Sequence, residues 1–196
     1  MPVLSRLLSQ KSLSPRDLLG LLIILPVAFI ILLAIGIAAS SAMETMHFSR
    51  ATDQILNIVA AARQFAAQEK TFSTQPGQDL LMPLARAGLV PDVVTDTPPA
   101  YLNNPWHGTI KAMAPVPLVM RLESNVPVHD CRHLAMFFTK DAVELGLEAM
   151  EARAGAGDSW RRFYDNDHAI APSQSYIEAG CGQGPITMLA LVFRPI

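Results

Sequence analysis

One stretch, LLGLLIILPVAFIILLAIGIAA, residues Leu18–Ala39, carries no charged side chain and determines the architecture of the whole chain. An α-helix rises 1.5 Å per residue, so about 20 apolar residues cross the roughly 30 Å hydrocarbon core of a membrane. Pro26 and Gly36 are unfavourable in soluble helices, but both residue types are commoner in membrane helices. We therefore predict a transmembrane helix segment over 18–39, with a kink near Pro26.

The two flanks of this segment differ in charge. Its N-terminal flank holds the basic residues and one acidic residue, Arg6, Lys11, Arg16 and Asp17, whereas the stretch after it is mixed in sign. The positive-inside bias then predicts that 1–20 is a basic cytoplasmic leader and that the rest of the chain lies outside the cytoplasm. A cleaved secretory signal is the alternative, with Ser40-Ser41-Ala42 as its cleavage site. Signal h-regions run about 7–15 residues, and because this segment is longer we favour an anchor.

The composition agrees with a membrane-anchored chain. Of the 196 residues, 51% are hydrophobic and only 16% are charged, against about 25% charged in an average soluble domain. The excess of apolar residues is concentrated in 18–39, which argues against a freely soluble cytosolic enzyme. The formal net charge of −2 and the lack of a basic stripe argue against sequence-specific nucleic-acid binding.

The helix is expected to continue beyond the apolar segment. Between Ser40 and Lys70 there is no Pro or Gly, and Ala is abundant. Apolar residues recur there at spacings of three or four, at Met43, Met46, Ile55, Val59, Ala62 and Phe65. We predict an amphipathic continuation over 40–70, with one side packed on the globular domain that follows.

Residues 71–196 are predicted to form that globular extracytoplasmic head, and the whole chain is predicted to be of the α+β class, with the long N-terminal helix packed on a small antiparallel sheet. The expected elements are a short helix over 78–88 ending at Gly88, a turn-rich loop over 95–105, a hairpin of 109–114 and 117–124, a helix over 127–151, an irregular region over 160–175 and a strand over 186–193. The last strand lacks clean alternation, which suggests burial on both faces.

The two cysteines of the chain, Cys131 and Cys181, both fall in the part expected outside the cytoplasm, where disulfides form and persist. If they pair, only one connectivity is possible. The cross-link would contribute about 4 kcal/mol by chain entropy. The alternative is two free buried thiols.

The chain offers no persuasive catalytic set. His129 and His133 would share a helix face, but two histidines do not complete a zinc site, so we interpret them as part of a solvated face. The segment 180–184 is glycine-rich yet lacks the Lys-Ser/Thr of a phosphate-binding loop, and 165–167 resembles a calcium loop only superficially. Trp106 and Trp160 are expected to be packing residues. We predict neither an enzyme nor a metal or cofactor site.

The order of several local motifs resembles that of the type IV pilin family, in its type IVb branch. The motifs are LMPLARAGLVPD at 81–92, YLNNPWHGTIKAM at 101–113, VPVHDCRHLAMFF at 126–138 and GCGQGPITMLALVF at 180–193. In that family a short helix leads to an Asn-rich turn, then to a Cys-bearing helix, and the second Cys precedes a terminal strand. The match touches most of residues 18–193 and implies a pilin-like fold.

The resemblance also implies processing and assembly. A prepilin peptidase would cut the leader between Gly20 and Leu21, and the helices would then pack in the core of a filament. The polymerisation helix would present Leu25, Pro26, Phe29, Leu33 and Gly36. Leu25 is a departure, because the family usually has a Glu at this fifth mature position. An unpaired charge in lipid is costly, so that Glu is thought to pair with a neighbour's N-terminal amine.

The expected function is that of a structural subunit, a major or minor pilin, of a type IVb pilus or a related secretion or conjugation filament. Its expected partners are other copies of itself, the prepilin peptidase and the pilus assembly machinery. It would lie in the inner membrane before assembly and in an extracellular pilus afterwards. The alternative is a non-polymerising single-pass membrane protein whose extracytoplasmic domain binds a ligand or a partner.

Overall fold

The structure is a computed structural model that describes residues 15–69, 71–72, 75–96, 98–155, 157–166 and 173–194. For 15–24 and 37–40 it describes the backbone alone. The chain divides into two compact units, with the boundary between Thr45 and Met46. We describe each unit by itself.

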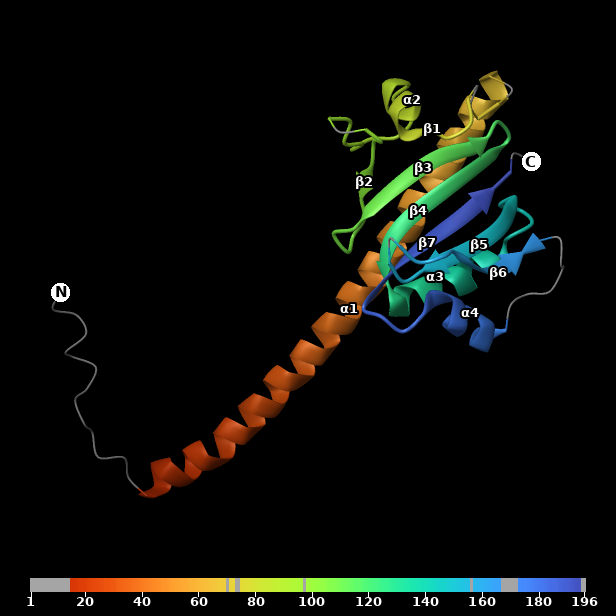
Figure 1. The fold of residues 1–196 in the computed structure, drawn as a ribbon. Helices are drawn as coiled ribbons and strands as arrows, with labels where there is room; N and C mark the ends of the chain where they lie inside the picture. Colours follow the sequence, from red (N-terminus) through yellow and green to blue (C-terminus); the bar gives the residue numbers. More distant parts are fainter. Residues whose placement is uncertain are drawn as a thin grey trace. The chain divides into compact units, whose positions relative to one another are not determined.

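Helix α1, Pro15–Glu69, is a single α-helix of 55 residues that supplies elements to both units (Figure 1). Pro26 lies inside it and does not end it. Within the described residues, this is the one helix that is long and apolar enough to cross a membrane. The predicted continuity between the apolar segment and the amphipathic segment is therefore present in the structure.

The second unit is built on an antiparallel sheet of seven strands (Figure 1). The strands are β1, Gln78–Asp79; β2, Leu102–Asn103; β3, Thr109–Val116; β4, Val119–Pro127; β5, Leu147–Arg153; β6, Arg161–Asp165; and β7, Ile186–Phe193. Their order is β1-β3-β4-β7-β5-β6, and β2 pairs with β3. The chain is therefore of the α+β class, with α1 packed on an antiparallel sheet.

The last strand in the sequence, β7, lies in the middle of this sheet. Strand β7 pairs along its length with β4 on one side and with β5 on the other. Seven of its eight residues are buried or partly buried, and Ile186 at its start is exposed. The lack of alternation in ITMLALVF is explained by this central position, because both faces of the strand are covered.

The two faces of the sheet differ in chemistry. On β4, Met120, Leu122 and Val126 are buried and face inward. They share one hydrophobic core with Ile55, Ile58, Val59 and Ala62 of α1. In Figure 1 the second half of α1 runs behind β3 and β4. The intervening residues Arg121 and Glu123 lie on the opposite, outer face.

Helix α3, Val128–Lys140, is shorter than the helix predicted over 127–151, so that prediction was wrong beyond Lys140. Residues 141–146 form turns, and the chain enters β5 at Leu147. Gly146 adopts a positive φ of 54°, which other residues rarely adopt. The apolar spacing of Leu145 and Ala149 fits a helix, but pairing with β7 prevails over that local pattern.

Other predicted elements need smaller corrections. Helix α2 covers Leu81–Arg86 rather than 78–88, because Gln78–Asp79 forms strand β1, although Gly88 has the positive φ expected after a helix end. The region 160–175 is not wholly irregular, since it contains β6 and the first residues of helix α4, Gln174–Cys181. The hairpin of β3 and β4 is confirmed.

Candidate functional site

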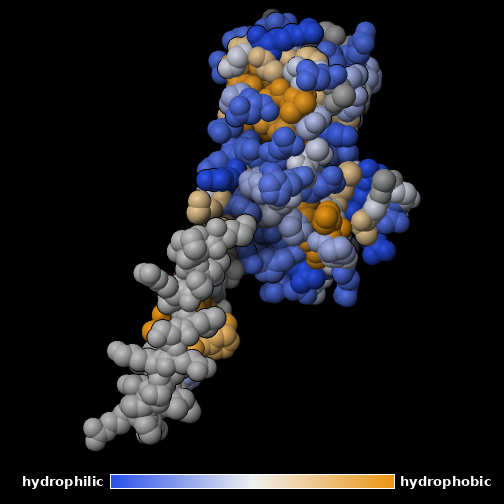
Figure 2. All heavy atoms as spheres, turned by 90° about the vertical axis from the view of Figure 1, so that its left-hand side faces the viewer, coloured by the Kyte–Doolittle hydropathy of each residue, from blue (hydrophilic) through white to orange (hydrophobic). Residues whose placement is uncertain are grey.

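The apolar part of α1 presents its large side chains to the outside. In the structure Leu25 is 60% exposed, Phe29 62% and Leu33 51%. On the face that Figure 2 shows, the described atoms of the first unit are coloured hydrophobic, whereas the second unit is mostly hydrophilic with separate hydrophobic patches. Exposing such a stripe to water would be unfavourable, so it requires either lipid or another apolar surface.

The other residues expected on the polymerisation helix also lie on α1. Pro26 is inside the helix, and an added Cβ at Gly36 would meet no atom within 4 Å. Gly20 and Leu21 lie on α1 in the part where only the backbone is described. The leader residues 1–14 lie outside the described residues.

The amphipathic part of α1 is anchored in the core of the second unit. Ile55, Ile58 and Val59 are at most 3% exposed. Met43 and Met46, which the spacing placed on the same apolar face, are instead exposed. The helix face that is buried in the second unit therefore starts later than the sequence predicted, with partly buried Phe48 against the core.

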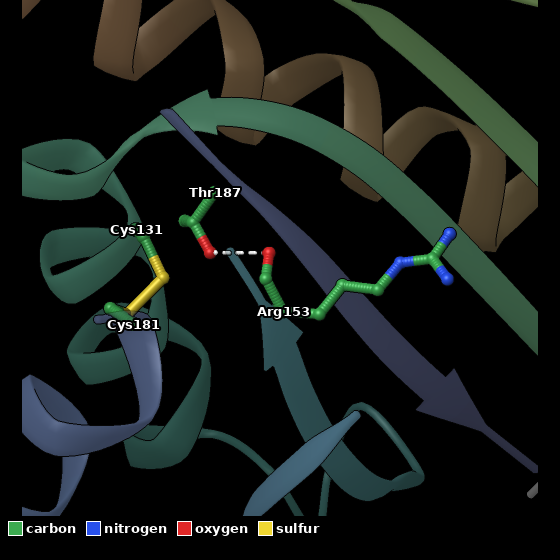
Figure 3. The surroundings of a disulfide bond; sticks show 4 residues. All are labelled: Cys131, Arg153, Cys181 and Thr187. Atoms are coloured by element: carbon green, nitrogen blue, oxygen red, sulfur yellow. Dashed lines mark hydrogen bonds between the residues drawn. A yellow bond between two sulfur atoms is a disulfide. The ribbon is translucent and has the colours of Figure 1, made fainter. Parts of the chain in front are cut away.

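The predicted disulfide is present. Cys131 on α3 and Cys181 at the end of α4 are bonded, with their Cα atoms 6.0 Å apart, and both residues are buried. Next to this bond, the hydroxyl of Thr187 on β7 donates a hydrogen bond of 3.0 Å to the backbone carbonyl of Arg153 on β5 (Figure 3). The cross-link joins α3 to α4, and the hydrogen bond joins the start of β7 to the end of β5.

A charged cluster covers the outer face of the sheet opposite α1. Arg121 donates hydrogen bonds to Glu123 on its own strand, at 2.8 Å, and to Glu151 on β5, at 2.6 Å. Arg162 on β6 binds the other oxygen of Glu151 through two nitrogens, at 2.9 and 3.0 Å. In the register of the sheet, Ala190 of β7 lies between Glu123 of β4 and Glu151 of β5. Its small side chain leaves room for Arg121 to reach across.

Trp160 lies against the guanidinium groups of this cluster. The carbon Cζ of Arg121 is 4.2 Å from the centre of the indole ring, and that of Arg153 is 4.4 Å from it. Both distances are within the range of cation–π attraction. The expected packing role of Trp160 is therefore a contact with two cations on the outer face rather than with the apolar core. Trp106 packs, partly buried, against that core.

The cluster changes the ionisation of Glu151. Burial alone would raise the pKa of its carboxyl, but the hydrogen bonds and charges of Arg121 and Arg162 outweigh burial and lower it. The pKa of Arg162 is raised, chiefly by its hydrogen bond to Glu151. Both ions are thus favoured, as expected for a network that stabilises the fold.

Asn104 organises the turn before β3, and the sequence alone indicated only an Asn-rich turn there. Its side-chain oxygen accepts hydrogen bonds from the backbone N–H groups of Trp106 and Gly108, and its nitrogen donates to Ser124 and to the carbonyl of Asn125. The residue is 4% exposed. The sequence signal for this role is an Asn before a Pro in a turn. The burial of Asn104 against β4 could not be predicted from that signal.

Of the sequence candidates for metal and phosphate chemistry, His129 and His133 lie together on α3, with their ring centres 4.4 Å apart. Asp165 pairs with Arg162, and Asp167 lies outside the described residues. Gly180 and Gly182 line a depression of about 480 Å³ beside Arg153, Asp158 and Glu178. Among the residues that the structure describes, no three His, Cys, Asp or Glu side chains gather as a metal site.

Comparison of the sequence with models of protein families finds no match, and comparison with curated protein sequences finds none either.

Proposed function

We propose that this protein is a structural, non-enzymatic subunit of a filament of the type IVb pilus kind or of a related secretion or conjugation filament. The observation that supports the proposal best is the continuity of α1. One helix carries an exposed apolar stretch at 25–35 and then becomes part of the core of the globular unit at 55–66. A helix of this kind is stable in lipid, and it can exchange lipid for the helices of neighbouring copies.

In this proposal the globular unit forms the wall of the filament and its cross-link resists unfolding outside the cell. A contact repeated from copy to copy makes an open filament when its rotation does not close. The disulfide and the charged outer face of the sheet stabilise the unit without any partner. Polymerisation then depends on α1, with Leu25, Phe29 and Leu33 in the helix-to-helix contacts.

A single-pass membrane protein that does not polymerise is the second candidate. Leu25 favours it, because the acidic residue usual at this position in the resembled family is replaced by an aliphatic one. In that case the exposed apolar face of α1 would contact lipid permanently.

A cleavage assay separates the two candidates at the N-terminus. The full-length chain is co-expressed in membranes with a prepilin peptidase, and its mass is measured by intact-protein mass spectrometry. The filament proposal predicts loss of residues 1–20, leaving Leu21 at the N-terminus. The matched variant Gly20→Leu should remain full-length. A wild-type chain that stays uncut while a known pilin precursor is cut in the same membranes would contradict the proposal.

A further inference from the structure

Two histidine side chains lie together on the solvent face of α3. His129 and His133 are one helical turn apart, and their ring centres are 4.4 Å apart with the planes tilted by 43°. The side chain of His129 is 67% exposed, and His133 is exposed as well. Their spacing in the sequence made a shared face possible, and the structure brings the two rings into contact.

The helix that carries them is firmly held. On its opposite side Leu134, Ala135 and Phe138 are fully buried, and Cys131 is tied to α4 by the disulfide. The ring of His133 also meets the edge of Phe48 on α1, with the ring centres 6.2 Å apart. This contact limits the positions that the His133 ring can adopt. The backbone positions of the two histidines are therefore fixed relative to each other, and each ring still rotates about χ2.

We propose that His129 and His133 form a two-imidazole chelate for a d-block dication, with Cu(II) preferred over Ni(II) and Zn(II). A metal–nitrogen distance of about 2.0 Å places two neighbouring ligand nitrogens about 2.8 Å apart in the tetragonal geometry of Cu(II), and about 3.3 Å apart in the tetrahedral geometry of Zn(II). Rings whose centres are 4.4 Å apart reach these separations by rotation about χ2, which is a soft torsion for histidine. The order of affinity follows the general preference of nitrogen sites for Cu(II).

The chemistry of the surroundings is compatible with this proposal. The carboxylate of Asp130 lies 4.0 Å from Nδ1 of His129, so a negative charge is close to the pair. Two imidazoles leave further coordination positions, which water fills in the isolated subunit. Because the second imidazole binds an ion already held by the first, the pair should bind far more tightly than either ring alone.

Cu(II) titration of the untagged, detergent-solubilised full-length chain tests the chelate. Calorimetry should show one tight equivalent, and the electron paramagnetic resonance spectrum should show two imidazole nitrogens on the copper. His129→Ala and His133→Ala should each weaken binding by about 100-fold and reduce the signal to one nitrogen. Both positions are exposed, so circular dichroism of the two variants should match the wild type.

His107→Asn is the matched control, because His107 is an exposed histidine outside α3 with a positive φ of 61° that Asn tolerates. Its Cu(II) affinity should equal that of the wild type. The proposal is overturned if the wild type shows no two-nitrogen spectrum, or if either alanine variant binds Cu(II) as tightly as the wild type. Neither result would bear on filament formation.

Discussion

Gly180 is the residue at which the fold leaves least room beside the disulfide. It precedes Cys181 on α4, and a Cβ built on it would lie 2.5 Å from the ring of Phe163 on β6. A second ring atom, Cγ, and the Cβ of Phe163 also lie within 3 Å of that position. The glycine at position 180 is thus explained by close packing of α4 on β6.

The variant Gly180→Ala should therefore be less stable, by about 1–3 kcal/mol, because the methyl group forces Phe163 out of its position. Chemical unfolding followed by circular dichroism measures the change. Gly157→Ala is the control, since an added Cβ there meets no atom within 4 Å. Equal stability of the two variants would show that α4 is not packed on β6 as described.

Glu151 gives the charged cluster a predictable response to acid. Its pKa is lower in the folded chain than in the unfolded chain, so its ionised form stabilises the fold at pH values above the unfolded value of about 4.3. That stability is lost as the pH falls through the folded pKa. The unfolding free energy of the wild type should therefore drop between pH 6 and pH 3.

In Glu151→Gln this contribution to the acid-induced drop should disappear, leaving a shallower dependence of the unfolding free energy on pH. The control is Glu148→Gln on the same strand, where a more exposed Glu pairs with Arg194 and contributes less. If Glu151→Gln and the wild type lost stability in parallel, the lowered pKa of Glu151 would be contradicted.

At the scale of elements, local patterns in the sequence were sufficient where a segment's neighbours are close along the chain. The β3–β4 hairpin and the α1 spine were predicted in this way. The bond between Cys131 and Cys181, which are 50 residues apart, was expected from the number of cysteines rather than from a local pattern. The strand β5 was missed, because its apolar residues also fit a helix and only pairing with β7, some 40 residues later, makes it a strand. Strand β6 was missed for a similar reason, since it pairs with β5, and helix α4 contacts α3, β5 and β6, which are all distant from it along the chain or were not fully predicted.

One part of the candidate site could be predicted from the sequence, and the other part could not. The apolar segment of α1 is a property of one helix and could be predicted from its length and its lack of charged residues. The Arg121–Glu151–Arg162 cluster joins three strands, β4, β5 and β6, of which only β4 was expected, so no local pattern indicated it. Alternating charged residues on β4 were the only available signal, and they did not identify a partner on β5.

The disulfide makes a prediction at this scale, because it joins α3 to α4 just before the central strand begins. Cys131→Ser and Cys181→Ser should each destabilise the chain by about 4 kcal/mol, and by the same amount, since each removes the same cross-link. Unfolding in denaturant measures this, with the wild type under reducing conditions as the matched control. Alkylation that finds two free thiols in the oxidised wild type would contradict it.

At the scale of the whole molecule, the two halves of α1 differ in burial, and one substitution in each half can distinguish their roles. Leu33→Ala removes an exposed side chain, so it should change the unfolding free energy by less than about 0.5 kcal/mol. Ile58→Ala removes a side chain that is 1% exposed, so it should cost about 2–5 kcal/mol.

In cells the proposed filament predicts a further contrast between these variants. Leu33→Ala should lower the yield of sheared surface filaments while leaving the amount of folded subunit in the membrane unchanged. Ile58→Ala should lower both together. Filament yield unaffected by Leu33→Ala would argue against helix-to-helix contacts at this position.

The proposed function requires that the apolar part of α1 lies in the membrane before assembly and in the core of the filament afterwards. The most direct measurement is the N-terminal sequence of the protein sheared from the surface of cells that produce it. We expect a filament fraction whose subunit begins at Leu21. A protein found only in the membrane fraction, with Met1 still in place, would contradict it.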